Sequence, residues 1–203
     1  MSIDTSDRMR TLLGHGCHAL VLLTPTLVLA RALDTTTILF AVGVSAAAYF
    51  ESMSVVSSFD PREARELDPF ALRMAQVVGL TIIGMFWLSQ IEHYVHPLQP
   101  GLKSQLITGV GVVAMVVGAG LRVVSIRTLK HRFLSDIRAH EERVSSGIYA
   151  WMRHPSELGT LWFTLGATLT LRAVWVTCLA CVVLVPIYVW RVRREEIAWT
   201  RSA

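Results

Sequence analysis

The sequence predicts an all-α protein, a polytopic bundle of about five to six transmembrane helices whose last two helices form a hairpin. Two observations lead to this prediction. Hydrophobic residues make up 53% of the 203 positions and the mean hydropathy is +0.49, which is more apolar than a water-soluble domain of this size tolerates. Apolar stretches of roughly 20 residues, the length that crosses the hydrocarbon core, also recur along the chain.

Five apolar stretches mark the expected helices: residues 16–33, 36–56, 71–94, 106–126 and 158–191. The last stretch is too long for one span, so we expect a tight hairpin of residues 158–171 and 173–190 that turns at Arg172. The first helix of this hairpin is short and need not cross the membrane completely. The opening residues, MSIDTSDRMR, mix charges of both signs, and no small-residue cleavage site follows an isolated apolar core, so we expect no signal peptide.

The positive charges predict the orientation, because short loops rich in Lys and Arg stay in the cytoplasm. With six spans and the N-terminus inside, only Arg31, Lys103 and Arg172 fall in the outer turns. The other sixteen of the nineteen Lys and Arg residues lie at cytoplasmic termini, loops or span ends. Both termini are therefore expected in the cytoplasm. The pI of about 9.3 follows from this topology and from contact with anionic membrane lipids, so no nucleic-acid partner is expected.

The cysteines and histidines predict no metal or redox site. Cys17, Cys178 and Cys181 all fall in apolar helices. Cys178 and Cys181 form a Cys-x-x-Cys without polar neighbours that would lower a thiol pKa, so we expect packing residues rather than a redox pair. The segment EHYVH, residues 92–96, contains a His-x-x-His pair that could bind a metal. It is expected at the outer end of the third helix, and interfacial histidines explain it better.

One long polar insertion, residues 127–153, interrupts the apolar chain. It alternates charges with apolar residues, which suits a segment lying on the membrane surface, although a solvated basic loop fits its composition equally well. At its end, in SSGIYAWMRHPSELG, Gly147 can turn the chain, Pro155 suits the first position of a helix and His154 stands where a cap would be. A helix entrance at the interface does not account for Arg153 beside His154.

Two more polar groups fall near the same expected end of the bundle. Glu195 and Glu196 follow three arginines in YVWRVRREEIAWTRSA, which is either a cationic anchor with two solvated carboxylates or part of a site. The return of the hairpin would bring them back to the face of Arg153 and His154. In GAGLR, residues 118–122, small residues serve helix packing or allow a flat ligand to approach the backbone.

The deepest charges of the predicted bundle are Arg122 and Glu51. Charged residues inside a membrane usually face a partner or a water-filled cavity, because an unpaired charge in hydrocarbon is costly. We therefore expect the two side chains to share one polar network.

Together, the segments G-x-Y, R-H-P-S-x-L-G, an apolar hairpin and R-x-R-x-E-E resemble the isoprenylcysteine carboxyl methyltransferases and their bacterial relatives, a superfamily that includes the phospholipid N-methyltransferases. The resemblance runs from Gly118 to Glu196. It implies a single membrane domain in which residues 1–105 form N-terminal transmembrane helices and residues 106–203 form a methyltransferase-like core. It also implies a cytoplasm-facing pocket for S-adenosylmethionine and a location in a bacterial inner membrane.

The resemblance assigns roles to individual residues. Arg122, Arg153 and Glu196 are the candidate catalytic residues, and no metal ligand is expected. The chain departs from the family where Glu157 replaces the usual aromatic residue and where it ends soon after Glu196. The candidate cofactor-binding residues are Gly118, Gly120, Gly147, Tyr149, Arg153, His154, Pro155, Gly159, Glu195 and Glu196.

Methyl transfer from a sulfonium is an in-line displacement, so the protein mainly has to position acceptor and cofactor and exclude water. Glu195 and Glu196 can hold the cofactor's ammonium or ribose hydroxyls, Arg153 and His154 can take its carboxylate, and Arg122 can orient an anionic acceptor. The expected acceptor is a lipid-like or prenylated small molecule, and Glu157 disfavours a carboxylate head group unless nearby arginines neutralise it. The alternative is a non-catalytic or reductase-like membrane protein on a related helical scaffold.

Overall fold

The computed structural model describes residues 21–29, 33–56, 69–129 and 145–202, and every regular element in these residues is a helix. The predicted all-α class is therefore confirmed. A helical segment of residues 21–29 comes first. The helices after it are α2 (Thr35–Val56), α3 (Pro69–Val95), α4 (Leu102–Leu129), η3 (Gly147–Ala150), α5 (Pro155–Thr170) and α6 (Val174–Ser202).

The predicted apolar stretches coincide with these helices, since each begins and ends within a few residues of its stretch, except that α6 continues to Ser202. The hairpin is also confirmed: α5 ends at Thr170, α6 begins at Val174, and Arg172 between them adopts a positive φ of 59°. Predictions for Cys17, for residues 16–20 of the first stretch and for residues 130–144 of the polar insertion lie outside the described residues.

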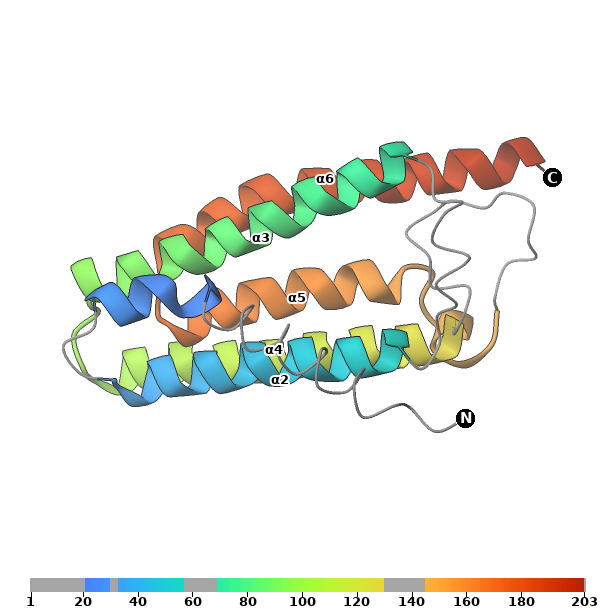
Figure 1. The fold of residues 1–203 in the computed structure, drawn as a ribbon. Helices are drawn as coiled ribbons and strands as arrows, with labels where there is room; N and C mark the ends of the chain where they lie inside the picture. Colours follow the sequence, from blue (N-terminus) through green and yellow to red (C-terminus); the bar gives the residue numbers. More distant parts are fainter. Residues whose placement is uncertain (1–20, 30–32, 57–68, 130–144, 203) are drawn as a thin grey trace, which may run out of the picture.

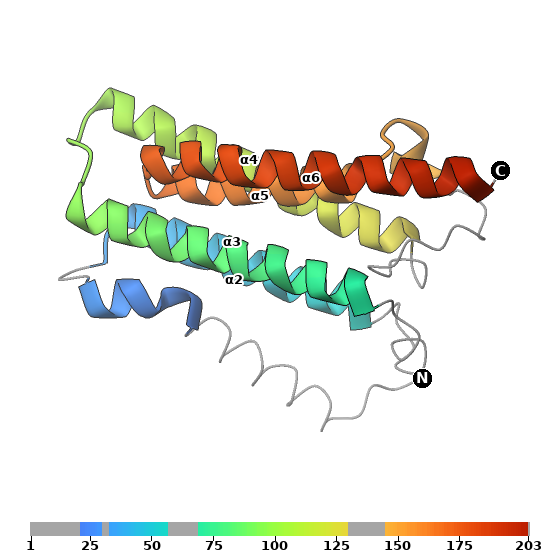
Figure 2. The same ribbon diagram turned by 90° about the horizontal axis from the view of Figure 1, so that it is seen from above.

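The helices lie roughly along one common direction (Figure 1). We call one end of this bundle the η3 end: it holds the C-terminal ends of α2, α4 and α6 and the N-terminal ends of α3 and α5 (Figures 1 and 2). The other end, which we call the hairpin end, holds the α5–α6 turn and the start of α4. Two apolar core clusters join the helices, one around Phe40, Phe86 and Met115 and the other around Met85 and Leu184.

Two of the described helices are long and apolar enough to cross a membrane: α4 (Leu102–Leu129) and the Val174–Ile197 part of α6. The Thr35–Glu51 part of α2 is also apolar but shorter. Along one side of α4, Leu102, Leu106, Val110 and Val113 expose more than half of their surface, at the three- and four-residue spacing of a single helix face. A stripe of this kind suits lipid contact rather than water, which supports a membrane protein.

The most extensive helix contact is that between α4 and α5, and glycines on both helices allow it. Gly111 and Gly118 on α4 are seven residues apart and face Gly166 and Gly159 on α5, which have the same spacing. A Cβ atom on Gly118 would overlap the Phe163 backbone and come within 2.6 Å of the Gly159 carbonyl oxygen. Small residues at this spacing let two helix backbones touch.

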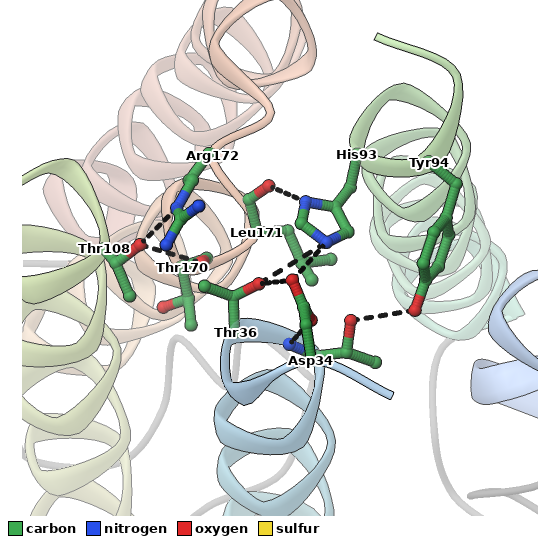
Figure 3. A network of polar contacts seen from close by, with 9 residues as sticks. Asp34, Thr36, His93, Tyr94, Thr108, Thr170, Leu171 and Arg172 are labelled. Carbon is green, nitrogen blue, oxygen red and sulfur yellow. Dashed lines mark hydrogen bonds and ion pairs between the residues drawn. The ribbon is translucent and has the colours of Figure 1, made fainter. Parts of the chain in front are cut away.

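A polar network closes the hairpin end (Figure 3). Asp34 caps α2, since its Oδ1 accepts a 2.8 Å hydrogen bond from the Thr37 amide. His93 of α3 places Nε2 3.0 Å from Asp34 Oδ2 and Nδ1 2.8 Å from the Leu171 carbonyl oxygen. Arg172 in the turn donates from Nε to Thr108 of α4 at 3.0 Å. The network thus joins α2, α3, α4 and the hairpin turn.

The side chain of Glu92 caps a helix to which it is not joined in sequence. Its two carboxylate oxygens accept hydrogen bonds from the backbone amides of Trp175 at 3.0 Å and Val176 at 2.8 Å, in the first turn of α6. A carboxylate there satisfies amides that have no partner within the helix and favours the helix dipole. The segment EHYVH therefore fastens α3 to the hairpin, through Glu92 and His93.

Candidate functional site

The candidate site begins where the chain enters α5 at the η3 end. Gly147 has a φ of +60°, a conformation that side chains disfavour, and its Cα lies against Thr128 of α4. Pro155 takes the first helical position and His154 the N-cap position, as the sequence predicted. The His154 side chain makes no capping hydrogen bond, because it reaches across to α6 instead.

The imidazole of His154 lies between the two glutamates near the end of α6. Nε2 is 3.0 Å from Glu196 Oε1, and Nδ1 is 3.4 Å from Glu195 Oε2. Arg153 approaches the other oxygen of Glu196 at 3.6 Å. The Arg153 side chain is 74% exposed, so its ion pair is weak, whereas that of His154 is only 16% exposed. The predicted meeting of these four side chains, which we call the entry cluster, is confirmed.

Tyr149 borders the entry cluster from η3. Burial raises the pKa of Tyr149 to about 12, and the nearby charges of Glu157 and Glu195 act in the same direction. Its phenol is therefore neutral and remains a hydrogen-bond donor at physiological pH. Trp151, two residues later, is 91% exposed and points away from the bundle.

Glu157, where the resembling family has an aromatic residue, has a counter-charge. Arg191 of α6 places Nη2 3.5 Å from Glu157 Oε1, and the Glu157 side chain is only 15% exposed. An ion pair of this kind offsets the negative charge that the sequence placed at the expected entrance. Arg191 thus supplies the neutralisation that the sequence left open.

Arg122 lies further inside the bundle and joins three helices. It donates from Nε and Nη2 to the carboxylate of Glu51 on α2, at 2.9 and 2.6 Å. Its Nη1 donates to Ser156 at 3.0 Å and Thr160 at 2.9 Å, both on α5. The expected network of Arg122 and Glu51 is confirmed.

The glycines predicted to bind a cofactor differ in their surroundings. Gly118 and Gly159 lie in the α4–α5 contact, where their α-carbons meet the opposite helix. Gly120 has nothing within 4 Å of the position a Cβ would take, so it faces away from that contact. Helix packing therefore explains Gly118 and Gly159, and a cofactor-binding role for the three glycines stays a prediction.

Sequence reasoning missed three residues of the site: Ser156, Thr160 and Arg191. Ser156 and Thr160 are four residues apart and therefore share one face of α5, which is a usable signal. Choosing Arg191 among the neighbouring arginines of α6 required knowing the rotation of that helix against α5.

The protonation of His154 makes the entry cluster sensitive to pH. Its hydrogen bond with Glu195 raises the pKa of His154 above the ordinary value, burial opposes this, and the hydrogen bond with Glu196 adds to it. A raised folded-state pKa means stabilisation that is complete below about pH 6.5 and is lost as pH rises through the folded-state pKa.

We therefore expect the apparent Tm of the purified protein in detergent to fall as pH rises from about 6 to about 9. In His154→Gln this component should disappear, with a loss of about 1–2 kcal/mol relative to the unsubstituted protein at the acidic end only. Thermal unfolding of both proteins across this pH range measures the difference. Parallel pH profiles would show that His154 is not charged in the cluster.

Comparisons with known proteins find similarity to one family of methyltransferases. Residues 106–202, which include α4 from its second turn onward, η3, α5 and α6, match the phospholipid methyltransferase family. The chain is also similar to the protein-S-isoprenylcysteine O-methyltransferase of Saccharomyces cerevisiae, with 32% identity over 74 residues. That match covers 34% of this chain and 31% of the relative's length. No solved structure matches the chain. The resemblance inferred from the motifs is therefore confirmed for the part of the chain that holds the entry cluster.

Proposed function

We propose that the protein is an integral membrane methyltransferase that uses S-adenosylmethionine, since residues 106–202 match the phospholipid methyltransferase family and the chain is similar to an isoprenylcysteine methyltransferase. The observation that carries the proposal is the entry cluster, in which His154 and Arg153 meet Glu195 and Glu196 at one end of the bundle. The proposal includes the finer expectations: five to six spans, both termini and the site on the cytoplasmic face, and a bacterial inner membrane.

The chemistry of the entry cluster fits the amino-acid end of the cofactor, which carries one ammonium and one carboxylate. Glu195 and Glu196 would hold the ammonium or ribose hydroxyls, and Arg153 and His154 would take the carboxylate. The charges of the cluster compensate one another without a ligand, so a zwitterion can replace these contacts without leaving a net charge. Tyr149 adds a neutral donor at the edge of the cluster.

When bound, the cofactor supplies an electrophilic methyl group, so the protein needs no acid–base triad. The residues of the chain then act by holding the acceptor in line with that methyl and by excluding water. The α4–α5 contact provides a rigid base, since the two backbones touch at Gly118 and Gly159. Arg153 and Glu196 would then act by binding the cofactor. Arg122 would act through its hydrogen bonds with Glu51, Ser156 and Thr160.

The proposed acceptor has a long hydrocarbon chain and a small polar head. The apolar outer face of α4 would lie in lipid, so an acceptor dissolved in the membrane reaches the helices from the side. The name of the matched family refers to phospholipids and that of the yeast relative to an isoprenylated cysteine, and both are amphiphiles. Burial of each methylene contributes roughly 0.8 kcal/mol, so short-chain acceptors should bind much more weakly.

Two measurements test the function. Calorimetry on the purified protein should show saturable binding of S-adenosylmethionine. A transfer assay with labelled cofactor should then show faster methylation of prenylated cysteines or aminolipids than of their short-chain counterparts. Absence of cofactor binding would favour the non-catalytic or reductase-like alternative, and equal rates on long and short chains would contradict entry from the membrane.

A further inference from the structure

The Arg122–Glu51 ion pair brings a helix from outside the family match into the site. Glu51 belongs to α2, whereas Arg122, Ser156 and Thr160 all lie within residues 106–202. The family resemblance therefore assigns no role to Glu51. Two parallel hydrogen bonds, at 2.9 and 2.6 Å, fix both the position and the plane of the guanidinium.

The location of this pair relates it to the proposed acceptor. Ser156 and Thr160 occupy the first two turns of α5, directly after His154 at the helix cap. Arg122 therefore lies just inside the bundle from the entry cluster. An amphiphile whose head group reaches the cofactor would place that head group between the cluster and Arg122.

The electrostatics of the pair decide which head group suits this position. The side chains of Arg122 and Glu51 are 27% and 36% exposed, so water screens their charges only in part. Glu51 cancels the charge of Arg122, while Nη1 of Arg122 is directed at Ser156 and Thr160. Glu157 of α5 also acts electrostatically on Arg122, but less strongly than Glu51, and it is paired with Arg191.

A second observation points to a ligand that forms hydrogen bonds at this depth. Tyr188 of α6 is 6% exposed, and within the described part of the chain its hydroxyl makes no hydrogen bond of good geometry, although the Thr160 side chain lies near enough to interact with it. Tyr188 is near enough to Arg122 for the two groups to interact electrostatically. A buried hydroxyl without a well-aligned partner is costly, and a polar, non-anionic head group would satisfy it.

We propose that Glu51 determines the specificity for the methyl acceptor. By neutralising Arg122, Glu51 makes the position between the entry cluster and Arg122 select an amine or other non-anionic head group over a carboxylate. This inference rests on the proposed function. It reverses the sequence-based expectation that Arg122 orients an anionic acceptor, because the guanidinium is held by a carboxylate of the protein itself.

The test is the affinity of the purified protein for a long-chain amine and a carboxylate of equal chain length, from ligand-dependent shifts in Tm. The unsubstituted protein should prefer the amine. Glu51→Gln leaves Arg122 charged beside a neutral amide, so the preference should move toward the carboxylate by at least about tenfold. An unchanged preference would overturn the proposal.

The double variant Glu51→Gln with Arg122→Gln is the matched control, because it removes both charges and should not gain carboxylate affinity. If Glu51→Gln does not fold, Glu51→Ala removes the same charge without leaving an amide beside Arg122, and it should shift the preference in the same direction. A folded Glu51→Ala variant with the original preference would also overturn the proposal. Calorimetry with S-adenosylmethionine separates the two proposals: cofactor binding with unchanged head-group preference refutes only the role of Glu51.

Discussion

Glu196→Gln should lower the affinity for S-adenosylmethionine by roughly ten- to a hundredfold, the cost of losing one or two hydrogen bonds to a charged group. Glu196 is the residue that both cations of the entry cluster approach, His154 at 3.0 Å and Arg153 at 3.6 Å. The amide retains the size of the side chain but cannot compensate the charge of a cofactor ammonium. Calorimetry measures the affinity, and methyl transfer should fall in parallel below saturation.

A matched control is Glu92 of α3, whose side chain caps the opposite end of α6, the helix that carries Glu196. Glu92→Gln weakens the cap on the first turn of α6, so it should lower the apparent Tm while leaving the affinity for S-adenosylmethionine unchanged. Glu196→Gln should lower the affinity for S-adenosylmethionine with only a small decrease in Tm, because His154 keeps its contact with Glu195. If Glu196→Gln binds the cofactor normally, the entry cluster is only a clamp between α5 and α6.

Hydropathy and turn residues predicted most of the fold. Burial in lipid leaves a direct record in composition, so the helix positions follow from the apolar stretches. The contact of His154 with Glu195 and Glu196 could be predicted as well, because a tight hairpin forces residues on either side of Arg172 to return to the same end. This step needed only connectivity.

Contacts between helices that are distant in sequence were harder to predict. The pairing of Glu157 with Arg191 and the capping of α6 by Glu92 depend on how each helix is rotated about its axis. The helices here are apolar on most sides, so periodicity gives little information about that rotation. Arg122 and Glu51 were an exception, since two opposite charges in an apolar bundle have few other ways to be stabilised.

The two glycines of GAGLR show most clearly what one sequence leaves open. Gly-x-Gly is compatible with close approach of a ligand and with close approach of a helix, and both require the absence of a side chain. The structure separates the two positions: Gly118 faces α5, whereas Gly120 has open space around it. The two glycines therefore have different physical reasons to lack a Cβ.

Gly118→Ala should destabilise the protein by about 1–3 kcal/mol, because the added methyl meets the backbone of α5 and the helices must separate. Gly120→Ala should be neutral or raise the Tm slightly, since alanine favours a helix by about 1 kcal/mol and no atom obstructs it. Thermal unfolding in detergent measures both. If Gly120→Ala keeps its stability but binds S-adenosylmethionine weakly, Gly120 contacts the cofactor and Gly118 supports the helix pair. Equal stability of the two variants would contradict the α4–α5 contact on which the site is built.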